Sequence, residues 1–234
     1  MEKSKLERFI SKYYLGGSIK NAKWQSNGNE LSVSCTTDDK NVLAMIAMKE
    51  DVLPKGTYGV FDTSMLSSML SVMGDSLDVV TRETNGKVTA LTLSDSNATA
   101  EYVLADPSAI SGTPELKNLP NFEISIDLDQ QFVTSFLRAK SALGEEREFT
   151  VVSDGKKTQV IIGYSNNNTH RITLNVTATE AVALSHTNFS ASLLKEILVA
   201  NKGMSGVMKI STKGIAHVSF QEQGYTTNYY LIKI

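Results

Sequence analysis

The spacing of hydrophobic and polar positions changes repeatedly along the chain. Apolar residues recur every three to four positions in 3–14, 64–73, 130–142 and 191–202, which predicts four amphipathic helices. Elsewhere apolar and polar residues alternate, which predicts strands at 22–26, 31–37, 42–48, 56–61, 77–82, 88–93 and 98–105, and again at 147–153, 158–163, 170–177, 182–188, 206–212, 215–221 and 225–233. Helices combined with short, consecutive antiparallel strands predict an α+β fold.

The order of these elements repeats at a shift of 127 to 128 residues. The segment Phe61–Leu70 matches Phe189–Leu198 at a shift of 128, and the turn Ser26–Gly28 matches Ser153–Gly155 at a shift of 127. One shift that aligns helices, turns and strands along the whole chain indicates a tandem duplication. Each copy is predicted to carry two helices packed on antiparallel sheet.

The two copies are predicted to form domains at residues 1–107 and 121–234, with an interdomain connector at 108–120. Residues 106–120 hold three of the four prolines, which favours a semi-extended segment over a helix or a central strand. The segment 122–126 resembles an opening strand that the first copy lacks or compresses.

Charge is distributed unevenly among these elements. The whole chain has a net charge of −2, but the four predicted helices carry +3, 0, +2 and +1 in chain order, which leaves −8 for the remainder. Including the capping residues Asp62 and Asp129 lowers the helix total to +4. Lys5, Arg8 and Lys12 share one face of the first helix. A basic helical face on an otherwise acidic chain suits a polyanion, although any solvated helix tends to be rich in lysine.

No constellation of catalytic or metal-ligating residues is present in the sequence. His170, His186 and His217 lie on or beside predicted strands without the spacing of a metal site, and Cys35 has no second cysteine and alternates with core positions. Gly155–Thr158 resembles the end of a phosphate loop but lacks the upstream glycine and lies in a hairpin turn. We therefore expect no enzymatic activity, no metal and no cofactor.

The sequence also lacks a secretion signal and a membrane span. The N-terminal segment has no uninterrupted apolar stretch, and nowhere do eighteen apolar residues run together. We expect a protein that stays in the cytoplasm and has no membrane partner.

Two segments resemble a known family, the polymerase-accessory sliding clamps of tailed bacteriophages. Val60–Val72 resembles the strand-to-helix segment of these clamps, Ala105–Ser108 resembles the exit of their first domain, and the duplicated two-helix domain extends the resemblance over nearly the whole chain. The resemblance implies a DNA-clamp fold in which three identical subunits form a ring, with all helices lining a central hole.

Such a ring would encircle duplex DNA without reading its sequence and would tether the replicative DNA polymerase for processivity. The resemblance further implies that an ATP-driven clamp loader opens the ring in the host-cell cytoplasm. Some phage clamps also serve late transcription.

The resemblance assigns three sets of site residues. DNA-facing residues in the hole would be Lys5, Arg8, Lys12, Arg138, Lys140, Lys195 and Lys202. Neighbouring subunits would pair residues 98–104 with 169–175, with Tyr102, Leu104, Arg171, Ile172 and Leu174 at the interface. A pocket for the C-terminal peptide of a partner would be formed by Leu116, Leu119, Tyr230 and Ile232, unless these residues only seal the domain junction.

A second hypothesis is a phage structural or assembly protein built from a duplicated α+β domain. Such a protein would also lack enzyme motifs, but it would give no reason for basic charge to gather on the helices. An enzyme with its site between two domains has no residue constellation to support it.

Overall fold

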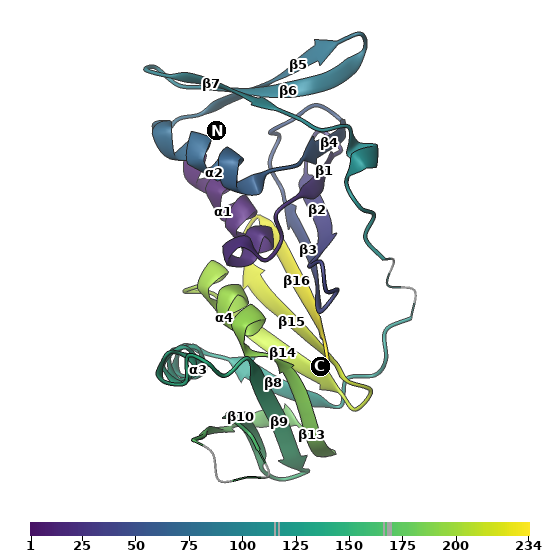
Figure 1. Cartoon of the computed structure of the whole chain (residues 1–234), viewed down its shortest axis with the longest axis vertical. Coiled ribbons are helices and arrows are strands. Elements are labelled where there is room, and N and C mark those ends of the chain that lie inside the picture. Colours follow the sequence, from purple (N-terminus) through teal and green to yellow (C-terminus); the bar gives the residue numbers. More distant parts are fainter. Residues whose placement is uncertain (115, 117, 166, 168–169) are drawn as a thin grey trace. The chain divides into compact units, whose positions relative to one another are not determined.

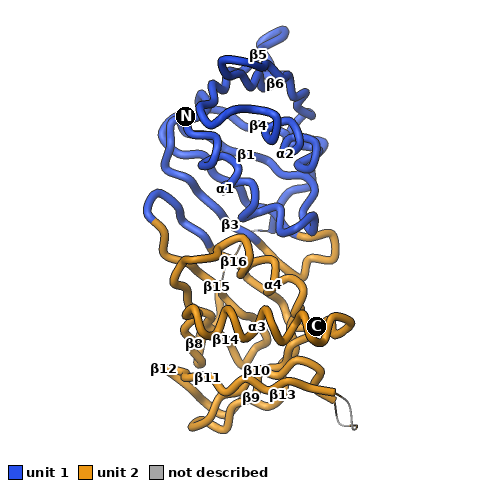
Figure 2. The backbone as a smooth tube through the Cα atoms, turned by 90° about the vertical axis from the view of Figure 1, so that its left-hand side faces the viewer, with its two compact units in different colours: residues 1–36, 44–114, 223–227 blue, residues 37–43, 115–222, 228–234 orange. Residues whose placement is uncertain are grey.

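The computed structural model describes residues 1–234 except 115, 117, 166, 168 and 169. The chain forms two compact units (Figure 2). Unit 1 comprises Met1–Thr36, Ala44–Pro114 and Gln223–Thr227, and unit 2 comprises Thr37–Leu43, Glu115–Glu222 and Asn228–Ile234. The predicted domain limits at residues 107 and 120 come from the sequence repeat. They stay a prediction, because residues 37–43 of the first copy belong to unit 2 and residues 223–227 of the second copy belong to unit 1.

Unit 1 combines two helices with two groups of antiparallel strands (Figure 1). The helices α1 (Lys3–Tyr14) and α2 (Thr63–Val72) pack side by side, and the short turn η1 (Leu15–Gly17) follows α1. Four strands lie in the order β4-β1-β2-β3, with β1 (Ala22–Ser26), β2 (Leu31–Thr36), β3 (Val42–Met48) and β4 (Gly56–Val60). A separate sheet contains β5 (Asp78–Thr84), β6 (Lys87–Ser94) and β7 (Thr99–Val103), followed by η2 (Pro107–Ala109).

Unit 2 repeats this plan. Its helices are α3 (Gln130–Ala142) and α4 (Ala191–Ala200). Five strands lie in the order β12-β8-β14-β15-β16, with β8 (Ile124–Leu128), β12 (Ala178–Glu180), β14 (Ser205–Ser211), β15 (Ile215–Glu222) and β16 (Tyr225–Ile232). Four more lie in the order β11-β10-β9-β13, with β9 (Glu148–Asp154), β10 (Thr158–Ile162), β11 (Ile172–Val176) and β13 (Ala183–Ser190).

An aromatic pair lies under the first helix of each copy, and in each pair only the helix residue occupies a matching position of the repeat. In unit 1 the ring of Phe9 packs edge-to-face against Trp24, with centroids 5.5 Å apart. In unit 2 Phe136, which matches Phe9 at a shift of 127, packs edge-to-face against Phe149 at 5.6 Å. Such pairs add about 0.5–1.5 kcal/mol beyond the burial of their surface. The duplication therefore conserves where the first helix of each copy meets its sheet.

Side-chain caps fix where three of the helices begin. The carboxylate of Asp62 accepts a hydrogen bond from the backbone N–H of Met65 at 2.9 Å, and Ser190 Oγ accepts one from Leu193 at 3.2 Å. Asp129 caps α3 in the same way. These residues satisfy amide groups that have no partner inside the helix.

The opening strand of the second copy is present, and its counterpart in the first copy is compressed as predicted. Strand β8 pairs with β14 over five residues. In the first copy the equivalent pairing shrinks to an isolated bridge between Glu2 and Ser76, beside a hydrogen bond from the Lys3 N–H to the Asp75 carbonyl. Strand β12 is not predicted by the sequence, because three residues are too short for an alternating pattern.

Strands β3 and β16 are antiparallel neighbours. Within unit 1 the Lys49 N–H donates to the Gly224 carbonyl at 2.8 Å, and within unit 2 the Ile232 N–H donates to the Asn41 carbonyl at 2.9 Å.

We predict that Asp62→Ala destabilises the fold by about 1 kcal/mol, because the N-terminal amides of α2 lose their capping acceptor. The change should appear as a lower midpoint in urea unfolding. Ser68→Ala is the matched control on the same helix: its hydroxyl is exposed and bonds only to the Ser64 carbonyl, so its effect should stay within about 0.5 kcal/mol. Equal midpoints for the two variants would contradict the capping role.

Candidate nucleic-acid and protein interfaces

The basic residues of α1 differ in how far they reach solvent. Arg8 is exposed, whereas the Lys5 ammonium forms an ion pair with the Glu50 carboxylate at 3.0 Å and has a side chain 40% exposed. The hydrogen bond to Glu50 raises the pKa of Lys5. Arg8 is therefore the most accessible cation of the predicted α1 face.

Lys12 has to be removed from the predicted DNA-facing set. The residue is 1% exposed, and its ammonium lies over the ring of Tyr225, 5.4 Å from the centroid. The Tyr225 hydroxyl donates to the Lys5 carbonyl, which holds the ring against α1. Helical spacing placed Lys12 on the same face as Arg8, but a residue more than two hundred positions away covers that end of the helix.

The two predicted cations of α3 also differ. Arg138 is exposed, whereas Lys140 is 8% exposed and donates to the Gly144 carbonyl at 2.7 Å. The Lys140 ammonium thus supplies a hydrogen-bond donor to a carbonyl just beyond the C-terminus of its own helix, where a positive charge also complements the helix dipole. We therefore remove Lys140 from the predicted set and retain Arg138.

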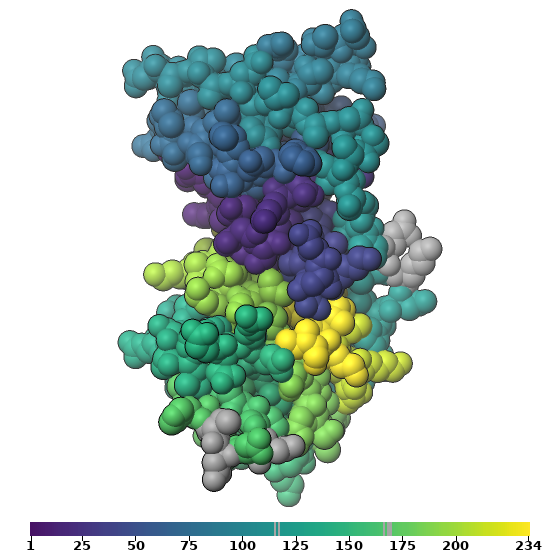
Figure 3. Space-filling model, viewed as in Figure 1, coloured from purple at the N-terminus to yellow at the C-terminus, as the bar shows by residue number. Residues whose placement is uncertain are grey.

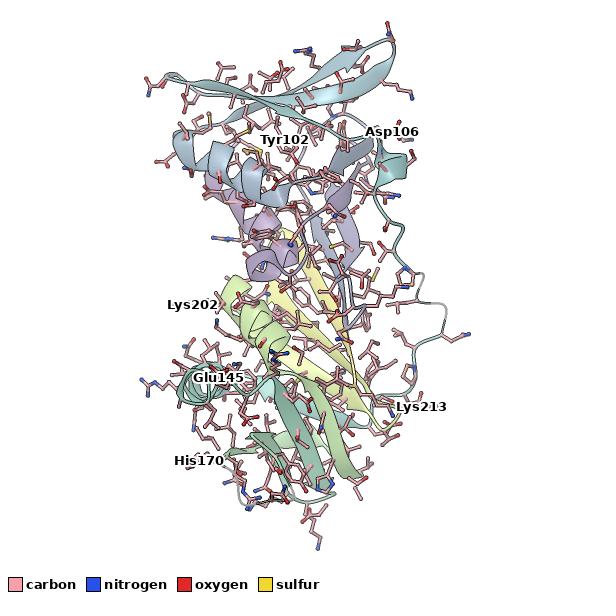
Figure 4. The ribbon with its side chains drawn as sticks, in the orientation of Figure 1. Tyr102, Asp106, Glu145, His170, Lys202 and Lys213 are labelled. Carbon is pink, nitrogen blue, oxygen red and sulfur yellow. The ribbon has the colours of Figure 1, made fainter. Side chains whose placement is uncertain are left out.

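Both predicted cations of the α4 region are exposed. The Lys195 ammonium lies 3.0 Å from the Glu196 carboxylate. Lys202 falls in the turn after α4, because the helix ends at Ala200 rather than at the predicted residue 202 (Figure 4). An exposed pair of this kind is worth little in water, so Lys195 remains available to a competing anion.

Helix α2 contributes hydroxyl groups instead of charge. Ser68 Oγ donates to the Ser64 carbonyl at 2.9 Å, and Ser71 Oγ donates to the Ser68 carbonyl at 2.7 Å. With Ser67, these residues form a polar face of short side chains next to the buried face that contains Leu66 and Leu70. Hydroxyl groups can contact phosphate oxygens without holding them strongly.

The residues predicted to form a partner pocket lie in unit 2. Leu116, Leu119 and Ile232 are 40%, 43% and 40% exposed, whereas Tyr230 is 9% exposed. The structure adds an aromatic neighbour that the sequence did not signal: the ring of His217 stacks on Tyr230 with centroids 4.6 Å apart. Strand alternation places both residues on the same face of the sheet, which is the only signal in the sequence that pairs them.

The imidazole of His217 is held in its neutral form. Partial burial lowers its pKa below 6.5 and the charge of Lys209 lowers it further, while a 2.9 Å hydrogen bond to Asn228 opposes both effects. Lys209 stands directly opposite His217 on the neighbouring strand. The His217–Tyr230 ring pair is therefore uncharged at neutral pH, and the ammonium of Lys209 is the positive charge next to it on the same face of the sheet.

Strand β7 is an edge strand, but the residues at its edge are not those predicted. Tyr102 is 3% exposed, and its hydroxyl bridges the backbone N–H and carbonyl of Asp62 at the start of α2 (Figure 4). The Leu104 N–H donates to the Thr89 carbonyl on the β6 side. The backbone groups of Tyr102 and Leu104 thus point toward β6. We therefore correct the predicted subunit-interface residues of β7 from these two to the alternate residues of the strand.

The backbone groups of Thr99, Glu101 and Val103 point away from β6. Ala105, which has the same parity, donates its N–H to the Gly59 carbonyl on the side opposite β6. The three side chains are exposed, and Val103 is 70% exposed. The backbone edge of β7 and the apolar side chain of Val103 therefore face solvent, while the Glu101 carboxylate pairs with Arg82.

Strand β11 is the edge of its sheet in unit 2. Arg171 is exposed, and Ile172 and Leu174 are half-buried, while the predicted Thr169 lies outside the described residues. A groove of about 330 Å³ follows the strand. It is lined by residues 173–177, by Asp127 and Asp129 before α3, and by Gln131, Phe132 and Ser135 at the start of α3. Helix α3 therefore flanks the β11 edge as α2 flanks the β7 edge.

Within the described parts of the chain, no group of three or more histidine, cysteine, aspartate or glutamate residues is arranged to hold a metal ion. Cys35 is buried, and burial raises the pKa of its thiol to about 12. Among the described helices, none combines the length and apolar character that crossing a membrane requires.

The arrangement of helices and strands is the PCNA-like clamp fold, α+β with two helices and antiparallel sheet in each half, as the sequence predicts. One structure with this fold is that of A. fulgidus PCNA with the C-terminal region of FEN-1 bound: it is 15% identical to this chain, with a TM-score of 0.79, and the match covers 100% of this chain and 96% of that chain. Another is proliferating cellular nuclear antigen from Entamoeba histolytica, 14% identical with a TM-score of 0.76 and the same coverage. No family model matches the sequence, and no curated protein matches it.

We predict that Lys209→Ala raises the pKa of His217, because removing a neighbouring positive charge makes the imidazolium less unfavourable. The titration of the His217 ring can be followed by NMR. Lys213→Ala, in the turn between β14 and β15, is the control and should leave the pKa unchanged. An unchanged His217 titration in Lys209→Ala would show that burial alone sets the pKa.

Proposed function

We propose that this protein is a DNA sliding clamp: a ring that encircles duplex DNA and keeps a polymerase on its template without any catalytic activity of its own. The observation that carries the proposal is the likeness of the whole chain to two PCNA structures. Duplication of the two-helix unit supports it, because several copies of such a unit are needed to surround a duplex.

The DNA-facing surface is formed by exposed cations and short hydroxyl side chains of the helices. The cations that stay in the set are Lys5, Arg8, Arg138, Lys195 and Lys202. Few cations mean few simultaneous phosphate contacts, and each contact is broken easily as salt rises. Weak contacts to the backbone position the duplex without reading its sequence, which suits a ring that slides.

The ring is a homotrimer closed by head-to-tail contacts. The free edges of β7 and β11 support this arrangement, since one edge belongs to each half of the chain and a heterologous contact can close into a ring. Unpaired edges are a liability in a monomer, and pairing them between subunits removes both.

Partner proteins bind through short peptide tails at the exposed apolar residues Leu116, Leu119 and Ile232, next to Tyr230. The structure of A. fulgidus PCNA with the C-terminal region of FEN-1 supports this mode of binding. The partners are the replicative DNA polymerase and the ATP-driven clamp loader, and the setting is the cytoplasm of a cell infected by a tailed bacteriophage.

The alternative remains a structural or assembly protein of a phage. It shares the duplicated α+β unit, but it gives no reason for exposed basic residues to gather on the helices. Co-purification with virions rather than with replication proteins would favour this alternative.

We predict a solution mass near three times the 25.5 kDa of one chain, and retention on nicked circular DNA that disappears when the DNA is made linear. Only a closed ring slides off free ends. The measurements are light scattering and gel filtration after loading with a clamp-loader complex. A chain that stays monomeric at high concentration, or that is retained equally on both DNA forms, would contradict the proposal.

We predict that Arg8→Glu combined with Arg138→Glu shortens retention on circular DNA. The slope of log affinity against log salt should fall by about 0.9 for each phosphate that the variant no longer neutralises. Lys156→Glu combined with Lys213→Glu is the matched control, since it makes the same change in charge at exposed hairpin turns. An equal decrease in retention for the two double variants would attribute the effect to overall charge instead of to the helices.

A further inference from the structure

Strand β5 ends the three-stranded sheet of unit 1, and in the described part of the chain no strand lies along its outer edge (Figure 1). Figure 3 shows this sheet at the surface, in blue and teal at the top of the view. The equivalent strand of the second copy is β14, because Val80 pairs with Thr92 on β6 as Val207 pairs with Ser219 on β15, both at a shift of 127. Strand β14 is covered on its outer edge by β8, so the second copy shows what fits an edge of this kind.

The backbone groups on the open edge belong to Val79, Thr81 and Glu83. Just before the strand, the Leu77 N–H donates to the Met1 carbonyl at 2.8 Å, and the Leu77 carbonyl accepts from the Met1 nitrogen at 2.7 Å. Leu77 therefore faces outward, and in a strand every second residue after it has the same direction. The pairing with Met1 ends before β5 begins, which leaves the outward groups of the strand itself open.

The side chains next to this edge are incompletely covered. In unit 2, Ile124, Ile126 and Leu128 of β8 are each 0% exposed and close the core beside β14. In unit 1, Val79 and Thr81 are only half-buried. A strand that adds to β5 therefore removes apolar surface from water, as β8 does in the second copy.

We infer that the β5 edge binds an extended segment of a second protein, which adds antiparallel to the sheet as β8 adds to β14. Open sheet edges bind peptides in this way, with affinity from main-chain hydrogen bonds and specificity from alternate side chains. The inference goes beyond the proposed function and uses neither the β7 edge nor the β11 edge.

The side chains of β5 specify the segment that fits. Its residue opposite Val79 is apolar, and its residue opposite the exposed Glu83 is basic, since opposite charges across strands stabilise a pair. Val80, on the other face, is 51% exposed, so the residue opposite Val80 is also apolar. Thr81 takes a β-branched partner, and Arg82 already pairs with a carboxylate within the sheet. Read from its N-terminus, the segment is basic, small polar, β-branched, apolar, apolar.

A second copy of β5 is a poor occupant of this edge. Antiparallel self-pairing places Glu83 opposite Val79 in one register and opposite Leu77 in the next. The first register sets a carboxylate against an apolar side chain, and in the second the backbone of Leu77 is already bonded to Met1. A segment that ends opposite Val79 and carries a basic residue opposite Glu83 has neither defect.

A synthetic peptide tests the inference. It has the sequence of residues 121–129 with Ile124→Lys and Asp127→Val, which gives β8 the side chains specified for the β5 edge, and it carries a fluorescent label. Binding to the full chain is measured by fluorescence anisotropy, and hydrogen exchange followed by NMR locates the contact. The Thr81 amide should become protected when the peptide binds, whereas the Val80 amide, which faces β6, should be protected with and without the peptide.

Three variants of the full chain separate backbone pairing from side-chain contacts. Thr81→Pro removes an outward N–H without removing a bond to β6, so it should weaken binding about tenfold or more. Thr81→Ala is the matched control, because it keeps the N–H and should retain most of the affinity. Glu83→Lys should reverse the preference between this peptide and one with Ile124→Glu, by about two- to fivefold for each peptide.

No binding of the peptide, or equal binding of a peptide with the same residues in scrambled order, would overturn the inference. Equal losses in Thr81→Pro and Thr81→Ala would overturn pairing through the backbone. Protection of the Thr81 amide that rises with protein concentration, without peptide, would assign the edge to a second copy instead. Unchanged protection of the Val80 amide excludes misfolding of a variant, and Glu83→Lys keeps the test decisive if Thr81→Pro does not fold. Solution mass and retention on DNA test the proposed function separately, so either idea can fail while the other stands.

Discussion

Backbone hydrogen bonding at strand edges is the constraint on which this structure depends. An exposed edge leaves a row of N–H and carbonyl groups that another strand can pair with. Strand β7 ends one sheet and β11 ends another, and each edge is flanked by a helix of its own unit. On β7, the residues whose backbone groups point away from β6 are also the exposed ones, so the proposed pairing of this edge would satisfy those groups.

Much of the fold can be predicted from the sequence because the chain contains the same pattern twice. The prediction of a hairpin turn at Ser26–Gly28 is strengthened because Ser153–Gly155 repeats the turn. The capping residues Asp62 and Ser190 likewise mark the start of the second helix in each copy. The repeat does not reach β12, whose three residues have no counterpart. The repeat also does not predict differences in exposure: Phe61 is exposed, whereas the matching residue Phe189 is buried.

The candidate site is less predictable because accessibility depends on contacts between distant parts of the chain. Helical spacing groups Lys12 with Arg8, but the ring of Tyr225 occupies the space beside Lys12. Lys140 belongs to the end of its own helix because a carbonyl there needs a donor. In β7, alternation correctly gives two faces but does not tell which backbone groups are already bonded to β6. The His217–Tyr230 stack is likewise invisible without the register of two strands.

The pairing of β3 with β16 within one polypeptide has a consequence for assembly by mass action. In the proposed trimeric ring of six repeated units, three of the six strand contacts would be tethered within a chain and would form at an effective concentration set by that chain, independent of how dilute the protein is. Only the other three would depend on encounters between molecules. The duplication would thereby halve the number of subunits that must meet, and reversible opening of the proposed ring would be restricted to one kind of joint.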